Sequence, residues 1–480
     1  MRPTRRRPAA RLGPLLLAAA LPITAARAQT PAAPNTAAAA DSLGPAVDSI
    51  AARVLAATGV PSASVAVVRH GQLAYANAYG LARLAPRAPA APAMRYGVGS
   101  ISKQFTAAVL LLLQQEGKLA LDDPVERWVP GLTRGRDVTL RQLLSHTSGY
   151  QDFWPQDYVP PEMERPTTAR AILDRWAKRP LDFEPGTRWQ YSNTNYVIAG
   201  LAAERASGVP FSRLVRERIL RPLGIASAVD FDSAGPGAIE PVGYMRFGLG
   251  PLRPATATGP GWMYAAGELA MTAGDLAKWD VSVIRQSLLS PASYQEFGRA
   301  VLLANGTSTN YGLGVDVYNL RGHRVLAHDG EVAGFVASNV VLPDDSAAVV
   351  VLTNQDASEA AGSIGSAVAR LLVQTGADAG AEASARRARA VFEGLQRGEI
   401  DRALFTPNAN AYFSAQALRD LAASLGPLGT PASVAPAGRS LRGGMTFRSY
   451  RVSFPGRELV VTTFETPEGL LEQYLVAPAG

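Results

Sequence analysis

Ser100 and Lys103 are the first two side chains whose types and spacing suit chemistry. Three residues apart on a helix, they lie on one face about one turn apart. Lysine is rare in this chain, because only four of the 47 basic residues are lysines. A buried lysine can lose its proton whereas arginine stays charged, so Lys103 is suited to take the proton of the Ser100 hydroxyl. The alternative is a serine that caps the helix and a solvated lysine.

Two more short motifs follow along the chain. Tyr191 and Asn193 lie in EPGTRWQYSNTNYVIAG, just before another predicted helix. A phenol can relay a proton to a leaving group, and a carboxamide can hold a substrate amide. His328-Asp329-Gly330 lies in AHDGEVAGF, on the first strand predicted in the C-terminal half, and glycine on a strand lets a backbone or a ligand approach closely. The structural alternatives are a tyrosine packed in a loop, an asparagine that caps a helix and a structural histidine.

In the order Ser-x-x-Lys, Tyr-x-Asn and His-x-Gly, the chain resembles the serine β-lactamase and penicillin-binding protein family, closest to its class C β-lactamase and D,D-peptidase branch. The resemblance covers roughly Asp41 to Thr375. It is carried by GSISKQFTAAVLLLLQQEGKLALDDPVERWVP, TLRQLLSHTSG, FEPGTRWQYSNTNYVIAG and the stretch from AHDGEVAGF to VVVLTNQ, in family order. His146, in the second of these segments, is expected to be structural.

The resemblance implies a role for each motif residue. Ser100 would be the acyl-accepting nucleophile and Lys103 its activating partner. Tyr191 would act as a base or as a proton relay toward the leaving group. Asn193 would hydrogen-bond the amide of the substrate. No cofactor and no metal are implied, and a chain with four His, no Cys and no H-E-x-x-H pattern offers no obvious metal site.

The third motif departs from the family pattern. His328 stands where the family usually has the first residue of Lys-Thr-Gly, so it is expected to be an electrostatic or hydrogen-bonding group. The backbone N–H groups of Ser100 and Glu331 would form an oxyanion hole beside Gly330. Asp329 and Glu331 add two acids to a strand that is usually cationic, which disfavours a penicillin carboxylate and leaves room for esters, D-amino-acid amides or an amine held by either acid.

The elements that must position these residues lie far apart in the chain. A helix is predicted near residues 44–57 and a hairpin at 62–69 and 72–80, followed by the helix that starts at Ser100. Strands return at 324–328, 335–342 and 346–353, with a turn at 343–345 and a closing helix over about 357–375. The predicted fold class is therefore α/β: a β-lactamase-like sandwich, with an antiparallel sheet flanked by helices, that carries an all-α lobe.

The chain divides into five predicted parts. A basic, then apolar N-terminus with an A-x-A site indicates a signal peptide at 1–28, followed by a disordered leader at 29–41. The hydrolase domain is expected over 42–375, with the helical lobe at about 121–250. A linker at 376–385 precedes a small α+β accessory domain at 386–480, with helical patterns at 388–398 and 414–425 and strands at about 446–454, 458–464 and 470–476.

The amino-acid composition indicates where the protein is located and which partners it has. The net charge of +7 falls to about +1 without the six arginines of the predicted signal peptide, so the high pI indicates no nucleic-acid partner. The chain has no cysteine for a disulfide or a lipid anchor, and no stretch long enough for a membrane span. We therefore expect a periplasmic or secreted protein that acts on a small-molecule or peptide substrate, with its oligomeric state open.

The sequence thus predicts an exported serine hydrolase that works through an acyl-enzyme on Ser100. An esterase or peptidase of broad specificity ranks first, then a D-alanyl-D-alanine carboxypeptidase or D-aminopeptidase, and a true β-lactamase last. The alternative from another class is a catalytically silent periplasmic binding or regulatory protein. Against it, all three motifs keep their reactive side chains.

Overall fold

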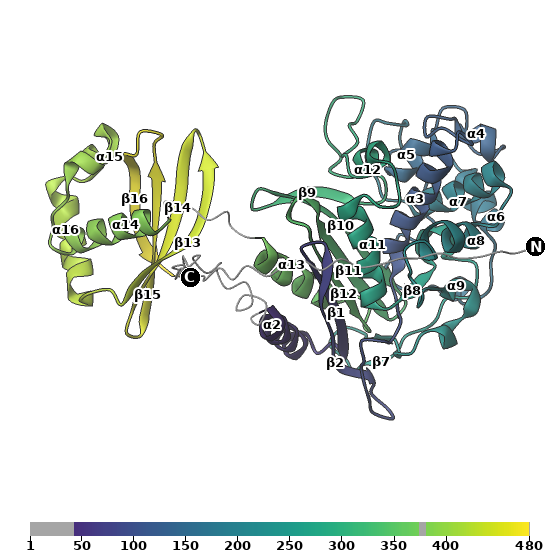
Figure 1. Cartoon of the computed structure of the whole chain (residues 1–480), viewed down its shortest axis with the longest axis horizontal. Helices are drawn as coiled ribbons and strands as arrows, with labels where there is room; N and C mark the ends of the chain where they lie inside the picture. The colour runs from purple at the N-terminus through teal and green to yellow at the C-terminus, as the bar shows by residue number, and fades with distance from the viewer. Residues whose placement is uncertain (1–42, 374–380, 480) are drawn as a thin grey trace, which may run out of the picture. The chain divides into compact units, whose positions relative to one another are not determined.

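The computed structural model of the chain describes residues 43–373 and 381–479. The predicted signal peptide and leader lie outside these residues. A seven-stranded antiparallel sheet has the order β3-β2-β1-β12-β11-β10-β9 (Figure 1). Its strands are β1 (Ser62–Arg69), β2 (Gln72–Arg83), β3 (Ala88–Pro89), β9 (Asp316–Leu320), β10 (His323–Val332), β11 (Phe335–Leu342) and β12 (Ala347–Thr353).

The middle of this sheet is built from apolar, mostly β-branched sequence. Every residue of β12 is buried, and so is every residue of β1 except the last. A strand that is buried on both faces reads as a continuous apolar run rather than an alternating one, which explains SASVAVVR and AAVVVLT. The antiparallel pairing of Ala63 with Thr353 joins the two ends of the domain. One sheet assembled from both ends of the domain is therefore confirmed.

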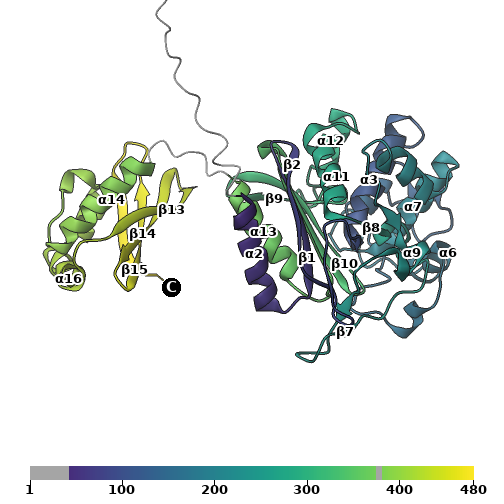
Figure 2. The same cartoon turned by 60° about the horizontal axis from the view of Figure 1, so that its bottom comes forward.

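Helices cover both faces of the sheet. On one face lie α2 (Leu43–Thr58) and α13 (Ala360–Leu372), and on the other lies α11 (Ala273–Arg285), as Figure 2 shows. Among the predicted elements, the hairpin and β11 match closely, and β10 extends four residues past the predicted strand. The prediction that His328 lies on the first C-terminal strand is wrong, because β9 precedes β10 in the chain and pairs with it.

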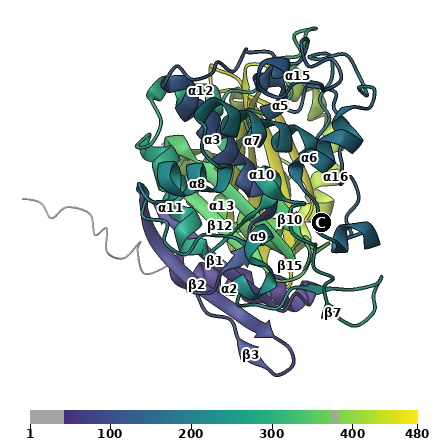
Figure 3. The ribbon, with the colours of Figure 1, turned by 90° about the vertical axis from the view of Figure 1, so that its right-hand side faces the viewer.

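The regular structure of the insert between the two halves of the sheet is mainly helical, and α11 also belongs to this insert. Its other helices are α3 (Ser102–Gln115), α4 (Val125–Trp128), α5 (Leu140–Leu144), α6 (Ala169–Ile172), α7 (Asn193–Ser207), α8 (Phe211–Val215), α9 (Phe231–Ala234), α10 (Tyr264–Gly267) and α12 (Pro291–Phe297), with short turns η1 (Gly99–Ile101), η2 (Pro161–Glu164), η3 (Leu173–Ala177), η4 (Arg216–Leu220) and η5 (Pro236–Ala238). Small strand pairs also occur here, in the sheets β4-β8-β5 and β6-β7, formed by β4 (Tyr96–Gly97), β5 (Val229–Asp230), β6 (Tyr244–Met245), β7 (Arg253–Pro254) and β8 (Leu269–Met271). In Figure 3, α3, α7 and α10 lie side by side in front of the sheet.

Helix α3 is the centre of this part of the core. Its residues from Ser102 to Leu113 are all buried, because α7 and α10 pack against it. A helix buried all round needs no polar face, which accounts for the run of four leucines at 110–113. The α-helix begins at Ser102, two residues later than predicted, because the chain enters it through the 3₁₀ turn η1. Ser100 therefore lies on that turn.

Residues from Ala381 onward form a second, smaller α+β unit. Its antiparallel sheet is β13 (Ser433–Arg442), β14 (Met445–Phe454), β15 (Arg457–Glu465) and β16 (Leu471–Pro478), packed with α14 (Ala381–Gln396), η7 (Arg402–Leu404), α15 (Pro407–Tyr412), α16 (Ala415–Leu425) and η8 (Gly426–Leu428). It has its own core around Phe392, Tyr450 and Val461. The predicted linker ends too late, since residues 381–385 already belong to α14, and residues 376–380 lie outside the described part of the chain.

In the segments 43–373 and 381–479, no helix combines the length and the hydrophobicity that a membrane crossing requires.

Candidate active site

Ser100 and Lys103 are in direct contact. The Lys103 Nζ lies 2.8 Å from the Ser100 Oγ, and the lysine side chain is completely buried. The two residues come from η1 and the first turn of α3, so the hydroxyl lies at the N-terminal end of the helix, within reach of the lysine nitrogen. The contact that the spacing predicts is therefore present.

Two further acceptors fix the orientation of the lysine nitrogen. Nζ lies 2.7 Å from the Asn193 Oδ1 and 2.7 Å from the backbone oxygen of Ala266, and neither oxygen can donate a hydrogen bond back. A neutral amine has two N–H groups and one lone pair. When both N–H groups are directed at these oxygens, the lone pair is left for the Ser100 hydroxyl.

Burial favours the neutral amine. It lowers the pKa of Lys103 from 10.5 to about 7, against the opposing effect of the Asp152 and Glu268 carboxylates. Burial also raises the pKa of both acids, and that of Glu268 well above its usual value. Neither carboxyl oxygen of Glu268 has a hydrogen-bond partner among the described residues. Lys103 is thus placed to exchange a proton near neutral pH.

This pKa predicts how activity depends on pH. Because only neutral Lys103 can accept the Ser100 proton, kcat/KM for an uncharged ester should rise as pH increases through about 7 and level off above it. Initial rates at low substrate concentration between pH 5.5 and 9 would measure this. A profile that is flat across this range would contradict proton transfer to Lys103.

Tyr191 and Asn193 lie on the other side of the nucleophile, at the start of α7. Tyr191 lines both cavities that Ser100 borders, and its ring centroid lies 5.0 Å from the Lys103 Nζ. Burial raises the pKa of this phenol above its usual value of 10, against the opposing effect of Ser100, so it stays protonated. That protonation state suits the relay of a proton rather than a starting tyrosinate. Asn193 links Lys103 to Asp152, since its backbone N donates to the Asp152 Oδ1 at 2.9 Å and its Nδ2 lies 3.3 Å from the Oδ2.

His328 is a neutral hydrogen-bonding group in this site. Its Nδ1 lies 2.5 Å from the backbone oxygen of Asp329, which can only accept, so Nδ1 carries the proton. Its Nε2 then accepts from the Tyr311 hydroxyl at 2.8 Å. Burial, together with the nearby Lys103, lowers the pKa of His328 to about 3. Of the two expected roles, the neutral ring supports the hydrogen-bonding one and leaves no cation for electrostatic attraction.

The backbones of η1 and β10 touch beside Ser100, and two glycines make this approach possible. A Cβ on Gly330 would meet the Val98 oxygen at 2.0 Å and the Ser100 nitrogen at 3.1 Å. Gly99 has a φ of 52°, and a Cβ there would meet the Glu331 nitrogen at 2.8 Å. The Ser100 and Glu331 N–H groups are thus brought close to each other, as an oxyanion hole requires.

Ser100 borders two cavities. The first, of about 400 Å³, is lined by aromatic and apolar side chains that include Phe153, Trp154, Tyr158, Trp262 and Met263. The second, of about 790 Å³, is open to solvent and is lined by Trp189, Tyr311, His328, Gly330 and residues of α13 among others. Tyr191 and Glu331 line both cavities. A substrate whose reacting carbonyl lies at Ser100 can therefore extend in two directions.

Both cavities are acidic. Asp152, Asp157, Glu331 and Asp356 line the first one, and none of its lining residues is Lys, Arg or His. Asp316, Asp329, Glu331 and Glu359 line the second, against a single arginine, Arg370. Burial and the neighbouring Asp329 raise the pKa of Asp316 to about 6. The surroundings of the nucleophile therefore favour a cationic group over an anionic one.

Several residues of the site were not identified from the sequence. They are Asp152, Trp189, Ala266, Glu268, Tyr311 and Asp316. Tyr311 had a usable signal, because the glycines of YGLG allow a close backbone approach and a Cβ on Gly312 would meet the Phe297 oxygen at 2.4 Å. Ala266 acts through its backbone oxygen, which no side-chain pattern reveals. In the described residues, no cluster of three or more His, Cys, Asp or Glu could hold a metal ion.

Comparisons with known proteins identify the family and the fold. The sequence model of the Beta-lactamase family matches residues 47–374. A D-aminopeptidase of Cereibacter sphaeroides (strain KD131 / KCTC 12085) is 30% identical over 302 residues, which are 62% of this chain and 57% of the relative. The matched part therefore spans little more than half the length of that relative.

Two solved structures resemble the fold. The D-amino acid amidase from Ochrobactrum anthropi SV3 in complex with D-phenylalanine has a TM-score of 0.61 at 26% identity and covers 69% of this chain and 98% of its own. The octameric penicillin-binding protein homologue from Pyrococcus abyssi has a TM-score of 0.61 at 22% identity. The match covers 90% of this chain and 98% of the homologue. At that identity the second comparison bears on the fold alone, and its coverage reaches into the smaller C-terminal unit.

Proposed function

Since the chain belongs to the Beta-lactamase family and is a serine hydrolase, we propose that it forms an acyl-enzyme on Ser100 and prefers D-amino-acid amides or short peptides with a free α-amine, with esters as further substrates. In this proposal Lys103 takes the hydroxyl proton and Tyr191 passes a proton to the leaving group. Water then resolves the acyl-enzyme, and no cofactor takes part.

The observation that carries the proposal is the position of two side chains next to the Ser100 hydroxyl. Ser100 contacts Lys103, whose pKa is lowered to about 7, and shares both cavities with the protonated Tyr191. A proton acceptor and a proton donor on one nucleophile are what acyl transfer needs. This arrangement also argues against the catalytically silent alternative.

The acidic lining supports the preference for a free amine. An α-ammonium group on the acyl part of the substrate would lie in the aromatic cavity, near Glu331, Asp157 and Asp356. The aromatic side chains there would receive an apolar side chain of the substrate. The names of the similar D-aminopeptidase and D-amino acid amidase agree with such a substrate.

The same lining disfavours substrates that carry a carboxylate near the reacting carbonyl. A penicillin or a D-alanyl-D-alanine terminus would bring a negative charge toward Glu331, Asp329 or Asp316 without a matching cation at His328, which is neutral. We therefore rank a D,D-carboxypeptidase below an aminopeptidase or amidase, and a true β-lactamase last.

Labelling with a fluorophosphonate tests the proposed nucleophile. Intact-mass analysis and peptide mapping should find one adduct, on Ser100, and none in the Ser100→Ala variant. A parallel incubation with a penicillin should give no persistent adduct. Folded protein without a fluorophosphonate adduct on Ser100 would refute the acyl-enzyme, and a stable penicilloyl adduct there would favour a penicillin-binding peptidase instead.

Replacement of Glu331 by glutamine tests the amine preference. The variant keeps the shape of the side chain and removes its charge, so KM for a D-phenylalanine anilide should rise by about tenfold, as expected for one lost charge contact. KM for the N-acetylated anilide should stay within about twofold. Glu359→Gln, which borders only the second cavity, is the matched control. Equal changes for both substrates would show that Glu331 does not recognise the amine.

Export and domain roles complete the proposal. We propose that the chain is exported to the periplasm or secreted, on the basis of the sequence pattern at 1–28 alone. The proposed hydrolase domain spans 42–375, and the C-terminal unit is an accessory domain with a packing or dimerisation role.

A further inference from the structure

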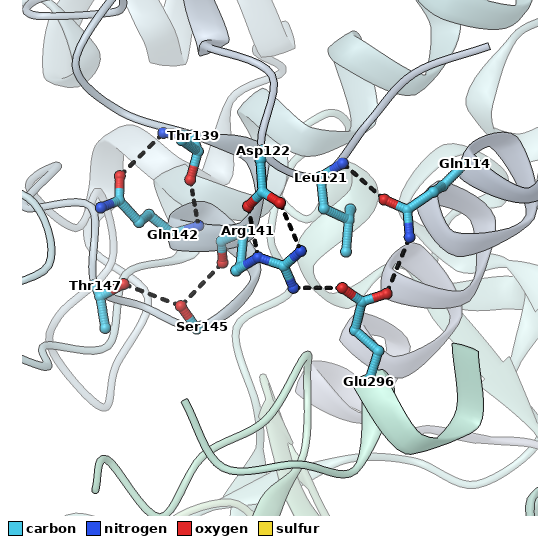
Figure 4. Close-up of polar contacts among 9 residues, drawn as sticks. All are labelled: Gln114, Leu121, Asp122, Thr139, Arg141, Gln142, Ser145, Thr147 and Glu296. Carbon is cyan, nitrogen blue, oxygen red and sulfur yellow. Dashed lines mark hydrogen bonds and ion pairs between the residues drawn. The ribbon is translucent and has the colours of Figure 1, made fainter. Parts of the chain in front are cut away.

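His146 occupies a buried position next to the proposed proton relay. It follows α5, whose first turn is closed by a reciprocal capping box between Thr139 and Gln142. Arg141 on the same helix binds both oxygens of Asp122, at 2.7 and 3.1 Å, and also Glu296, as Figure 4 shows. The loop that carries His146 therefore starts from a firmly anchored helix.

The residues on either side of His146 are also tied down. The Ser145 hydroxyl donates to the Arg141 backbone oxygen at 2.9 Å and lies 3.0 Å from the Thr147 hydroxyl (Figure 4). The Ser148 hydroxyl donates to the Asn195 Oδ1 of α7 at 2.6 Å. This loop is thus held to α5 at one end and to α7 at the other.

From this loop, His146 holds the backbone on both sides of Tyr191. The Gln190 N–H donates to the His146 backbone oxygen at 3.0 Å. The Ser192 N–H donates to the His146 Nδ1 at 3.1 Å. The imidazole also packs on the Tyr191 ring, with centroids 4.2 Å apart and planes 34° apart. One residue therefore makes three separate contacts with the three-residue segment that carries the phenol.

The hydrogen bonds define the state of the imidazole. Because Nδ1 accepts from Ser192, the proton of the neutral ring is on Nε2, which has no hydrogen-bond partner among the described residues. The rings of Tyr196, Tyr311 and Trp189 surround it at centroid distances of 5.0 to 6.0 Å. Burial, with Lys103 and His328 nearby, lowers the pKa of His146 well below its usual value, so the ring stays uncharged.

The backbone of His146 is in a conformation that side chains disfavour. Its φ is 57°, in the left-handed region, where residues other than glycine are uncommon. His146 is completely buried and keeps an N–H group that has no partner among the described residues, which packing alone does not explain. The strained backbone is explained if it directs the imidazole toward Tyr191, whose ring it contacts.

We infer that His146 is a positioning residue for the proposed reaction: it fixes the Tyr191 ring and backbone so that the phenol is directed at Ser100. This inference rests on the proposed function, because it gives His146 an effect only through Tyr191. His146 itself touches neither the nucleophile nor the substrate cavities.

A double-mutant cycle tests the inference. His146→Asn keeps an acceptor near the position of Nδ1 and tolerates a positive φ, but it removes the ring that supports Tyr191. His146→Phe keeps a ring and removes the acceptor. Each change is made in the natural protein and in a Tyr191→Phe background, and His323→Asn serves as the matched control, because His323 lies at the start of β10 and pairs with Asp345. Active sites are titrated with a fluorophosphonate, so that misfolded protein is not counted.

The inference is decided by whether the effect of the His146 variants on kcat depends on the presence of the Tyr191 hydroxyl. In the natural background, both His146 variants should lower kcat by about tenfold or more while KM stays within about threefold. In the Tyr191→Phe background, the same changes should alter kcat by less than about twofold, since the relay is already lost. His323→Asn should leave kcat unchanged in both backgrounds.

Two other outcomes overturn the inference and are distinguishable. If the His146 variants lower kcat equally in both backgrounds, or not at all, His146 does not act through Tyr191, although the proposed function stands. If Tyr191→Phe or Ser100→Ala itself retains full activity, the proposed function fails and the inference fails with it. His146→Phe carries a bulky side chain at a positive φ, so the His146→Asn variant alone decides between these outcomes if the phenylalanine variant does not fold.

Discussion

Replacement of Lys103 by arginine is expected to lower kcat/KM by about 10³-fold, although the substitution keeps a positively charged side chain. The reason is that the group at this position must accept a proton from Ser100. Lys103 is completely buried with a pKa of about 7, so it can be neutral when substrate binds, whereas a guanidinium stays protonated and cannot accept the Ser100 hydrogen. A larger, charged group would also lose the two oxygens of Asn193 and Ala266 that orient the amine.

Steady-state kinetics with a chromogenic ester measure this loss. Lys118→Arg is the matched control, because Lys118 lies just beyond the end of α3, is 44% exposed and pairs with Glu116. It should leave kcat/KM within about twofold, as surface changes usually do. Activity of Lys103→Arg within tenfold of the natural protein would show that a charged partner suffices and that Lys103 is not the proton acceptor.

The Gly330→Ala variant is expected to lower kcat by about 10² to 10³-fold, the effect of removing an oxyanion-hole donor. The added methyl group would lie 2.0 Å from the Val98 oxygen, so β10 and η1 must separate. That shift moves the Ser100 and Glu331 N–H groups apart, while the contact between Ser100 and Lys103, which lies within η1 and the first turn of α3, can be kept.

The control for this experiment is another glycine-to-alanine change. Gly274 lies on α11, away from both cavities, and a Cβ there would meet nothing within 4 Å. Gly274→Ala should therefore be as active as the natural protein, or slightly more stable, since alanine favours a helix. Circular dichroism checks that both variants are folded. A folded Gly330→Ala variant with normal kcat would show that the close approach of the two backbones is not needed for catalysis.

Much of the site could be predicted from the chain, because its motifs are local. Ser100 and Lys103 share one turn of chain, and Tyr191 and Asn193 share another, so their spacing alone indicated which groups belong together. The structure brings both pairs together at the Lys103 Nζ, which contacts Ser100 and Asn193 and lies 5.0 Å from the Tyr191 ring centroid. The fold class followed in the same way, since the apolar runs SASVAVVR and SAAVVVLT predict strands of one sheet, and the structure pairs them with each other in its middle.

What could not be predicted depends on contacts between distant segments. The neutral state of His328 results from burial beside Lys103, which the motif does not reveal. His146 was expected to be structural, because nothing in LLSHTSG shows that it meets Tyr191, 45 residues further on. The roles proposed for these residues stay predictions.

Among the strands that the sequence did not predict, β9 and β13 were missed for a simpler reason: they lie at sheet edges and have poor strand sequences. DVYNL of β9 contains Asp and Asn, which are depleted in strands, and its residues are half-buried or exposed. SVAPAGRSLR of β13 contains Pro436 and Gly438, and the pairing with β14 shifts register between them. An edge strand tolerates a proline because one side of its ladder needs no partner.

The pairing of β1 with β12 also affects when and how fast the chain can fold. Ala63 and Thr353 are about 290 residues apart in sequence, so the central ladder of the sheet is a contact of very long range. Closing such a long loop is entropically costly, and folds dominated by distant pairings fold slowly. At a ribosomal speed of about 5–20 residues per second, roughly 15–60 s separate the synthesis of these two strands. Gly330 follows Ser100 by 230 residues, so for roughly 12–46 s of this time Ser100 has no Gly330 beside it, and an incomplete chain cannot assemble the site.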